Sequence, residues 1–163
     1  MDLLVNLYSR KMAALASRVE SVDATIRVAL PPELHIVQAW VRQHFGEYWV
    51  SELTVAMSHQ PPGCLVAIVG GELVGFACYD ATARGFFGPT GVAESQRGKG
   101  IGAALLYHAL AAMKAQGYAY AVIGGVGPVE FYASAVGAVP IEADNEDIYQ
   151  GLLRVRPAPE PQQ

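Results

Sequence analysis

The sequence lacks several features that mark whole classes of proteins. Its 163 residues include only two cysteines, which are too few for a disulfide scaffold. No apolar run approaches the ~18 residues that a membrane-spanning helix needs. Charged residues are scarce at 16%, and the net charge of −4 argues against nucleic acid, which recruits basic surfaces. We therefore expect neither a membrane nor a nucleic-acid partner.

Signals for export and for oxidation are scarce as well. Asp2 is acidic where a signal peptide carries a base, and the apolar run LLV that follows is too short. A two-residue turn at 70–71 would place Cys64 and Cys78 on opposite faces of a hairpin, because strand side chains alternate. We therefore expect unpaired thiols in a reduced, cytoplasmic protein.

Apolar side chains are abundant, at 52%, and their spacing outlines one domain. We interpret residues 1–23 as an N-terminal extension, predicted to be helical, 24–156 as the domain and 157–163 as a disordered tail. The spacing predicts a strand at 24–30, helices at 31–45 and 51–59, a hairpin at 64–81, a strand at 85–92, a helix at 100–116, a strand at 118–123, a short helix within 124–138, and strands at 139–143 and 149–156. This order indicates an α+β (mixed α/β) fold.

The segment SQRGKGIGAALL, residues 95–106, combines three glycines, two basic residues and the start of a helical pattern. A helix start presents unpaired N–H groups and the positive end of the helix dipole, so it suits an anion. Glycine lets a phosphate oxygen approach the backbone, and Arg97 and Lys99 add positive charge. The segment predicts a pyrophosphate site; the alternative is a glycine-rich turn with solvated basic side chains.

Two common phosphate-binding motifs fit this segment poorly. A Walker A loop requires Ser or Thr after its lysine, whereas Gly100 follows Lys99. A Rossmann loop fits Gly98, Gly100 and Ala103, but the polar stretch AESQR separates it from the preceding strand. The next strand also ends without the acidic residue that would bind a ribose.

A third spacing, R-x-x-G-x-G from Arg97 to Gly102, is followed by the segment VEFYASAVGA. Here the sequence resembles the GNAT superfamily of acyltransferases, whose members transfer an acyl group from coenzyme A to an amine. The resemblance covers about residues 24–156. It implies a central, mostly antiparallel twisted sheet with a splayed parallel strand pair, flanked by helices. The glycines and proline at 88–91 and the glycines at 124–125 would line that gap, unless they only mark a shorter strand.

The resemblance implies an N-acetyltransferase that moves an acetyl group from acetyl-CoA to an amine by direct attack. The acceptor would be a small-molecule or protein amine of unknown identity, and a homodimer stays open. The alternative is a non-catalytic acyl-CoA-binding or regulatory domain of the same fold. His35, His59 and His108 have no metal-ligand spacing, so no metal is expected.

The resemblance also assigns residues to roles. Tyr132 would be catalytic, protonating the departing thiolate as general acid; the alternative is a tyrosine packed on the sheet with its hydroxyl at the rim. The residues expected to bind the cosubstrate are Val92, Arg97, Gly98, Lys99, Gly100, Ile101, Gly102 and Ala103.

One departure from the family pattern concerns the general base. Many relatives carry a glutamate on the strand that here reads FFGPT, residues 86–90, without an acid. The base stays open between Asp80, Glu47, His44 and an ordered water. For the acceptor we expect Glu47, Trp49 and Asp80 to contribute, although the aromatic residues of this region could equally belong to the core.

Overall fold

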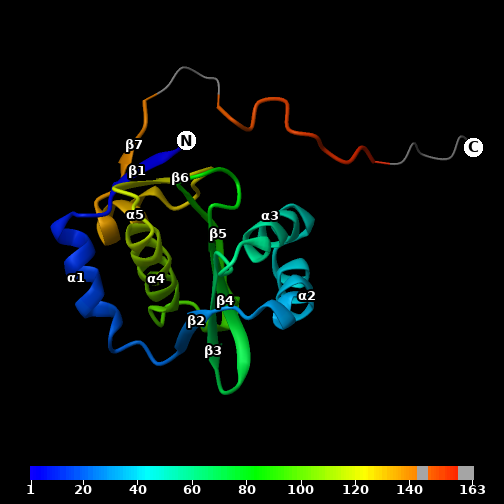
Figure 1. Cartoon of the computed structure of the whole chain (residues 1–163), viewed down its shortest axis with the longest axis horizontal. Helices are drawn as coiled ribbons and strands as arrows, with labels where there is room; N and C mark the ends of the chain where they lie inside the picture. The colour runs from blue at the N-terminus through cyan, green and yellow to red at the C-terminus, as the bar shows by residue number, and fades with distance from the viewer. Residues whose placement is uncertain (143–146, 158–163) are drawn as a thin grey trace, which may run out of the picture.

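The computed structural model describes residues 1–142 and 147–157 of the chain (Figure 1). Its elements are β1 (Leu3–Asn6), α1 (Arg10–Val19), β2 (Thr25–Val28), a 3-10 turn (Pro31–Glu33), α2 (Leu34–His44), α3 (Glu47–Ser58), β3 (Cys64–Val69), β4 (Glu72–Tyr79), β5 (Phe86–Val92), α4 (Ile101–Ala115), β6 (Tyr120–Ile123), α5 (Val129–Val136) and β7 (Val139–Pro140). A second 3-10 turn, Glu94–Gln96, precedes α4.

The strands form one seven-stranded sheet in the order β2-β3-β4-β5-β6-β1-β7. Neighbouring strands are antiparallel except β5 and β6, which run parallel and pair only at Phe86 with Val122 and at Phe87 with Ile123. Helices α1, α4 and α5 lie on one side of the sheet and α2 and α3 on the other (Figure 1). The predicted fold class, a mostly antiparallel sheet with one splayed parallel pair, is confirmed.

The splay of β5 from β6 has a local cause. Ala77 of β4 pairs with Thr90, but Tyr79 pairs with Phe87, so β5 contains an extra residue at Gly88–Pro89. Such a bulge bends a strand, and proline offers no N–H group to a neighbouring strand. Beyond Phe87, β5 therefore turns away from β6.

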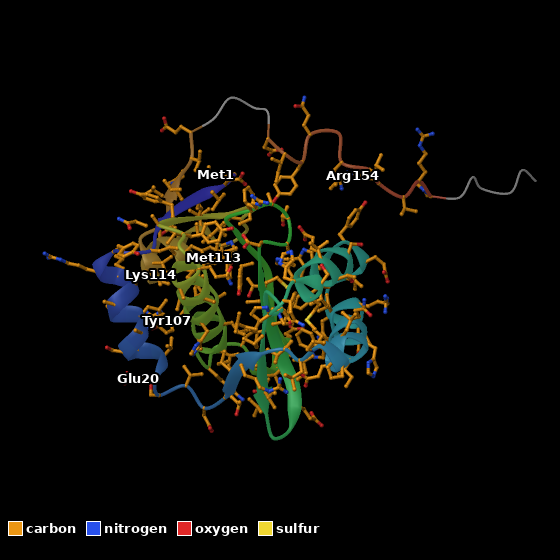
Figure 2. The ribbon with its side chains drawn as sticks, in the orientation of Figure 1. Met1, Glu20, Tyr107, Met113, Lys114 and Arg154 are labelled. Carbon is orange, nitrogen blue, oxygen red and sulfur yellow. The ribbon has the colours of Figure 1, made fainter. Side chains whose placement is uncertain are left out.

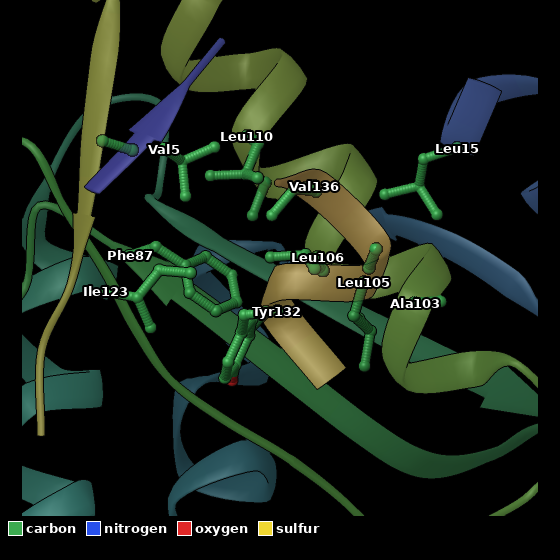
Figure 3. Close-up of a cluster of buried hydrophobic side chains, with 14 of the residues drawn as sticks. Val5, Leu15, Phe87, Ala103, Leu105, Leu106, Leu110, Ile123, Tyr132 and Val136 are labelled. Carbon is green, nitrogen blue, oxygen red and sulfur yellow. The ribbon is translucent and has the colours of Figure 1, made fainter. Parts of the chain in front are cut away.

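Two hydrophobic cores hold the layers together. The larger one joins the sheet to α1, α4 and α5, with α4 side chains such as Met113 filling the space (Figure 2). The close-up in Figure 3 shows Phe87, Leu106 and Leu110 gathered there. The smaller core joins α2 and α3 to β3 and β4, with Phe76 fully buried. Because apolar burial is the dominant stabilising term, both faces of the sheet are fixed.

The N-terminal segment differs from its prediction as a helical extension. Its helical stretch forms α1, but Leu3–Asn6 forms β1, which lies inside the sheet between β6 and β7. Leu3, Val5 and Leu7 are completely buried. A four-residue strand is too short for its period to stand out beside a helix, so the sequence pattern missed it.

The prediction that the two cysteines face opposite sides is wrong. Ala67 pairs with Gly75 and Ile68 with Leu73, so β4 has an extra residue at Val74. This bulge shifts the register by one and places Cys64 directly opposite Cys78. Both cysteines are free thiols, completely buried.

The C-terminal segment also differs from its prediction. The strand expected at 139–143 is only β7 within the described residues, and 149–156 form no strand. The Tyr149 N–H instead donates to Asp147, and Gly151 takes a left-handed φ of 73° in a turn. The segment then runs past the top of the sheet toward α3, where Arg154 lies (Figure 2). The predicted disordered tail, 157–163, lies outside the described residues apart from its first residue.

Candidate active site

A cavity of about 980 Å³ opens where β5 and β6 separate. The second half of β5 forms one wall, and residues 124–128, which follow β6, form the opposite wall. The start of α4 and Tyr132 of α5 lie on one side of the sheet, while Phe45 and side chains of α3 approach from the other. Segments from most of the chain therefore meet at the splayed strand pair.

The start of α4 is built to receive an anion. Gly98 and Gly100 have left-handed φ angles of 79° and 81°, which glycine adopts without a steric penalty. Within the described part of the chain, no group accepts a hydrogen bond from the N–H groups of residues 98–103. The first turn carries no acidic side chain. Unpaired N–H groups at a helix N-terminus bind phosphate-like anions.

Of the two basic side chains beside this turn, only one lines the cavity. Arg97 lines the cavity and its Nε donates to the Val92 carbonyl at 3.2 Å. Lys99 is exposed, donates from Nζ to Gln96 Oε1 at 3.0 Å, and does not line the cavity. The other residues predicted to bind the cosubstrate do line it, namely Val92, Gly98, Gly100, Ile101, Gly102 and Ala103.

The edge of β5 that faces the cavity carries free backbone groups. The Ala93 N–H donates to the Val74 carbonyl at 2.8 Å, which identifies Gly75 and Val92 as a non-hydrogen-bonded pair. The N–H of Val92 therefore points away from β4, and by alternation so does the N–H of Thr90. Because β6 has diverged here, both groups are directed into the gap. An extended ligand with amide groups could pair with this edge as a strand does.

Tyr132 lies between the apolar core and the cavity. Its ring packs against Phe87 at 6.3 Å and Phe131 at 5.0 Å between centroids, and only 6% of the residue is exposed. Figure 3 shows its ring at the edge of the cluster that includes Phe87 and Ile123. Burial raises the pKa of the Tyr132 hydroxyl to about 12. The group therefore holds its proton at neutral pH and can act as a donor.

Aromatic rings and one acidic side chain line the α2–α3 side of the cavity. The ring of Phe45 lies so close over Gly91 that no side chain would fit there, and Trp49 packs on Phe45 at 4.7 Å. Glu52, one helical turn after Trp49, also lines the cavity and accepts a hydrogen bond from the Thr82 hydroxyl.

Of the residues predicted to bind the acceptor, the structure brings Trp49 to the cavity and leaves two outside it. Glu47 is exposed at the start of α3 and pairs with Arg42. Asp80 accepts hydrogen bonds from the Tyr118 hydroxyl and the Gly85 N–H, so it holds the turn before β5.

The structure also shows where the three side chains considered for the general base lie. His44 stacks on Trp40 at 4.4 Å and, like Glu47 and Asp80, does not line the cavity. Sequence reasoning missed Glu52. Its spacing of three residues from Trp49, which places both on one helix face, was the available signal.

No group of three or more His, Cys, Asp or Glu side chains in residues 1–142 and 147–157 is placed to hold a metal ion. Over the same residues, every helix is too short or too polar to cross a bilayer.

The family model of the Acetyltransferase (GNAT) family matches residues 29–137. The chain therefore belongs to this family, and the resemblance inferred from the glycine-rich loop and the VEFYASAVGA segment is confirmed. Among proteins with curated functions, none matches the sequence.

Several solved structures share this fold. The chain is similar to the GCN5-related glucosamine N-acetyltransferase region of a fungal multi-domain GH3 β-N-acetylglucosaminidase, with a TM-score of 0.66 and 18% identity over 83% of this chain and 19% of that one. A GCN5-related N-acetyltransferase from Sphaerobacter thermophilus has a TM-score of 0.61 and 20% identity, and the match covers 85% of this chain and 47% of that one. A protein assigned to the GNAT family from Xanthomonas campestris pv. campestris has a TM-score of 0.51 and 19% identity, and the match covers 83% of this chain and 94% of that one. The chain spans less than half the length of the first two, and identities this low concern the fold.

Proposed function

We propose that this protein is an acetyl-CoA-dependent N-acetyltransferase in which an amine attacks the thioester directly. One observation carries the proposal: a single cavity joins an anion site at the start of α4, the free edge of β5 and the buried Tyr132 hydroxyl. These features match the three parts of acetyl-CoA, which are a charged pyrophosphate, an amide-bearing arm and a reactive thioester.

The residues present fit that cosubstrate. The N–H groups of residues 98–103 would hold the pyrophosphate, with Arg97 adding charge. Gly102 leaves room for it, because a Cβ there would meet only a Val92 methyl group, at 3.8 Å. The N–H group of Val92, nearest the pyrophosphate site, would pair with an amide of the pantetheine arm.

The chemistry then needs little beyond positioning. A neutral amine attacks the carbonyl carbon, and the free backbone N–H of Thr90, near Val92 on β5, stabilises the tetrahedral oxyanion. Collapse breaks the C–S bond, and Tyr132 gives its proton to the departing thiolate. The amine nitrogen loses a proton to solvent or a nearby base, and Tyr132 regains a proton from solvent, so the products are an amide and coenzyme A.

Turnover decides between this function and a non-catalytic acyl-CoA-binding domain, an alternative favoured by the absence of an acid on β5. The test incubates the protein with acetyl-CoA and a panel of primary amines, with free thiol and acetylated product measured together. Release of thiol with matching product supports the enzyme. Tight acetyl-CoA binding without product from any amine would leave only the binding function.

Thermal stability with and without ligand tests the cosubstrate separately. Coenzyme A at a hundredfold excess over its dissociation constant should stabilise the protein by ~2.7 kcal/mol. NAD should have no effect, because the loop lacks the ribose-binding acid of a Rossmann site. Stabilisation by NAD alone would contradict the proposal.

A further inference from the structure

The cavity is electrically polarised along β5. Among its lining residues in the described part of the chain, Arg97 is the single base and Glu52 the single acid. Arg97 bonds to Val92 at the end of β5, whereas Glu52 bonds to Thr82, which precedes the strand. A strand of this length extends about 20 Å, so Val92 and Thr82, the partners of the two charged side chains, lie toward opposite ends of it. One end of the cavity thus suits an anion and the other a cation.

The carboxylate of Glu52 is available to a ligand. Its one side-chain partner is the Thr82 hydroxyl, and the ion pairs formed within the described residues are Arg27–Glu33 and Arg42–Glu47. The side chain is half-buried, in a cavity whose walls are mostly apolar. A carboxylate held in such a setting without a cation gains by binding one.

Aromatic rings surround the same end. Trp49 precedes Glu52 by one turn of α3, Tyr149 comes from the C-terminal segment, and Phe45, whose ring lies over Gly91, packs on Trp49. The Tyr149 hydroxyl lies within 2.5 Å of where a Cβ on Gly124 would be, so it reaches the end of β6. The same Cβ position lies 3.0 Å from the ring of Phe86, the first residue of β5, so the Tyr149 hydroxyl lies at the Thr82 end of the strand. Aromatic faces attract ammonium groups and pack against apolar substituents.

The C-terminal segment also limits access to this end. Tyr149 lines the cavity beside Gly124, and four residues later the Leu153 carbonyl accepts a hydrogen bond from Tyr48 of α3 at 2.9 Å. The segment therefore bridges β6 and α3 above the sheet, in the direction marked by Arg154 in Figure 2. A small molecule needs less of an opening than a polypeptide does.

We infer that the acceptor is a small, positively charged amine with an aromatic or apolar body, and that Glu52 is the residue that binds its ammonium group. The bound ammonium gives one proton to water, and the neutral amine then attacks the thioester. The inference rests on the proposed function, because it concerns the second substrate of the same reaction. It excludes amines that carry a carboxylate next to the amino group, since that charge would face Glu52.

The test compares Glu52→Gln with the wild-type protein. Glutamine keeps the size of the side chain and an oxygen for Thr82 but removes the charge. Phenethylamine is the protonated reference acceptor, aniline the uncharged one, and phenylalanine the one with an added carboxylate. We expect Glu52→Gln to lower kcat/KM for phenethylamine by about 10- to 100-fold, mainly through KM. The value for aniline should change less than about threefold, because no ion pair is lost.

Three further measurements distinguish failure of this inference from failure of the proposed function. Glu72→Gln removes the same charge from an exposed position at the hairpin and should leave both acceptors unaffected. Acetyl-CoA affinity should be the same in all three proteins. Wild-type phenylalanine turnover should be at least about tenfold below that of phenethylamine.

Three outcomes would overturn the inference while the proposed function stands. They are equal loss with charged and uncharged acceptors, no loss in Glu52→Gln, and turnover with peptide amines but none of the small ones. Absence of acetyl-CoA binding and of turnover with every amine would instead overturn the proposed function itself.

Discussion

At the scale of single residues, Tyr132 carries the chemistry of the proposal. Tyr132→Phe removes one hydroxyl and keeps the ring that packs on Phe87. If the hydroxyl protonates the thiolate, kcat should fall by ~10²–10⁴-fold, whereas KM for acetyl-CoA should change little. Steady-state kinetics on both proteins measures this. An unchanged kcat would reduce Tyr132 to a packing residue.

The raised pKa of Tyr132 determines which control is informative. Because its pKa is about 12, the hydroxyl stays protonated through the ordinary working range, and a pH profile cannot expose its loss. A thioester with a more acidic thiol needs less help from an acid, so the variant should lose less rate with that donor. Equal losses with both donors would point to a structural effect.

Cys64 and Cys78 should not react with thiol reagents in the native protein. Both side chains are completely buried, and burial, together with the neighbouring Cys64, raises the pKa of Cys78. The thiolate is the reactive form, so the native protein should react negligibly with a thiol reagent, and both cysteines should react after unfolding. Rapid reaction in the native state would contradict the buried cross-strand arrangement.

At the scale of elements, Gly102→Glu at the start of α4 should raise the stability of the fold and lower the affinity for coenzyme A. Replacing glycine in a helix and adding an acid to the first turn should together stabilise the fold by about 1 kcal/mol. The same carboxylate would take the place of the pyrophosphate and repel it, so coenzyme A affinity should fall by roughly 100-fold. Urea unfolding and calorimetric titration measure the two effects.

Ala115→Glu is the matched control, because it adds the same charge at the exposed end of the same helix. It should destabilise the fold slightly, since acids oppose the dipole there, and leave coenzyme A binding intact. Gly100 is a poorer test position, because its φ of 81° and the nearby Val22 side chain would strain the fold. Unchanged affinity in Gly102→Glu would mean that the loop is only a turn.

The 3-10 turn before α2 should make stability sensitive to acid. Arg27 and the Leu30 N–H bind the Glu33 carboxylate and lower its pKa to about 2 from an ordinary 4.5. A lowered pKa stabilises the fold above about pH 4.5, and this contribution is lost as the pH falls toward 2. The pair is partly exposed, so the loss is at most about 1 kcal/mol. Glu33→Gln should abolish this part of the pH dependence in urea unfolding, and an identical slope in both proteins would contradict it.

The elements also indicate what the sequence could and could not predict. The anion site before α4 could be predicted because its glycines, basic residues and helix start are consecutive in the sequence. The bulge at Val74 was not, because it depends on how β4 pairs with β3, and it reversed the expected placement of the cysteines. β1 was missed for a related reason: its partners, β6 and β7, lie more than a hundred residues away in the sequence.

At the scale of the whole molecule, the acceptor end of the cavity comes from segments that share no motif. Trp49, Glu52, Thr82 and Tyr149 lie on three separate parts of the chain and meet only through the packing of α3 and the C-terminal segment. A lone glutamate on a helix is ordinarily a solvated residue, so Glu52 gave no signal by itself. The cosubstrate end could therefore be predicted from sequence, and the acceptor end needed the structure.

The most direct test of the account is a titration of the isotope-labelled protein with coenzyme A, followed by amide NMR shifts. The account predicts that the amides of residues 98–103 and of Thr90 and Val92 shift together at saturating ligand, because these N–H groups are free in the protein and face the cavity. NAD at the same concentration should leave them in place. Shifts confined to another surface, or none at all in these residues, would contradict it.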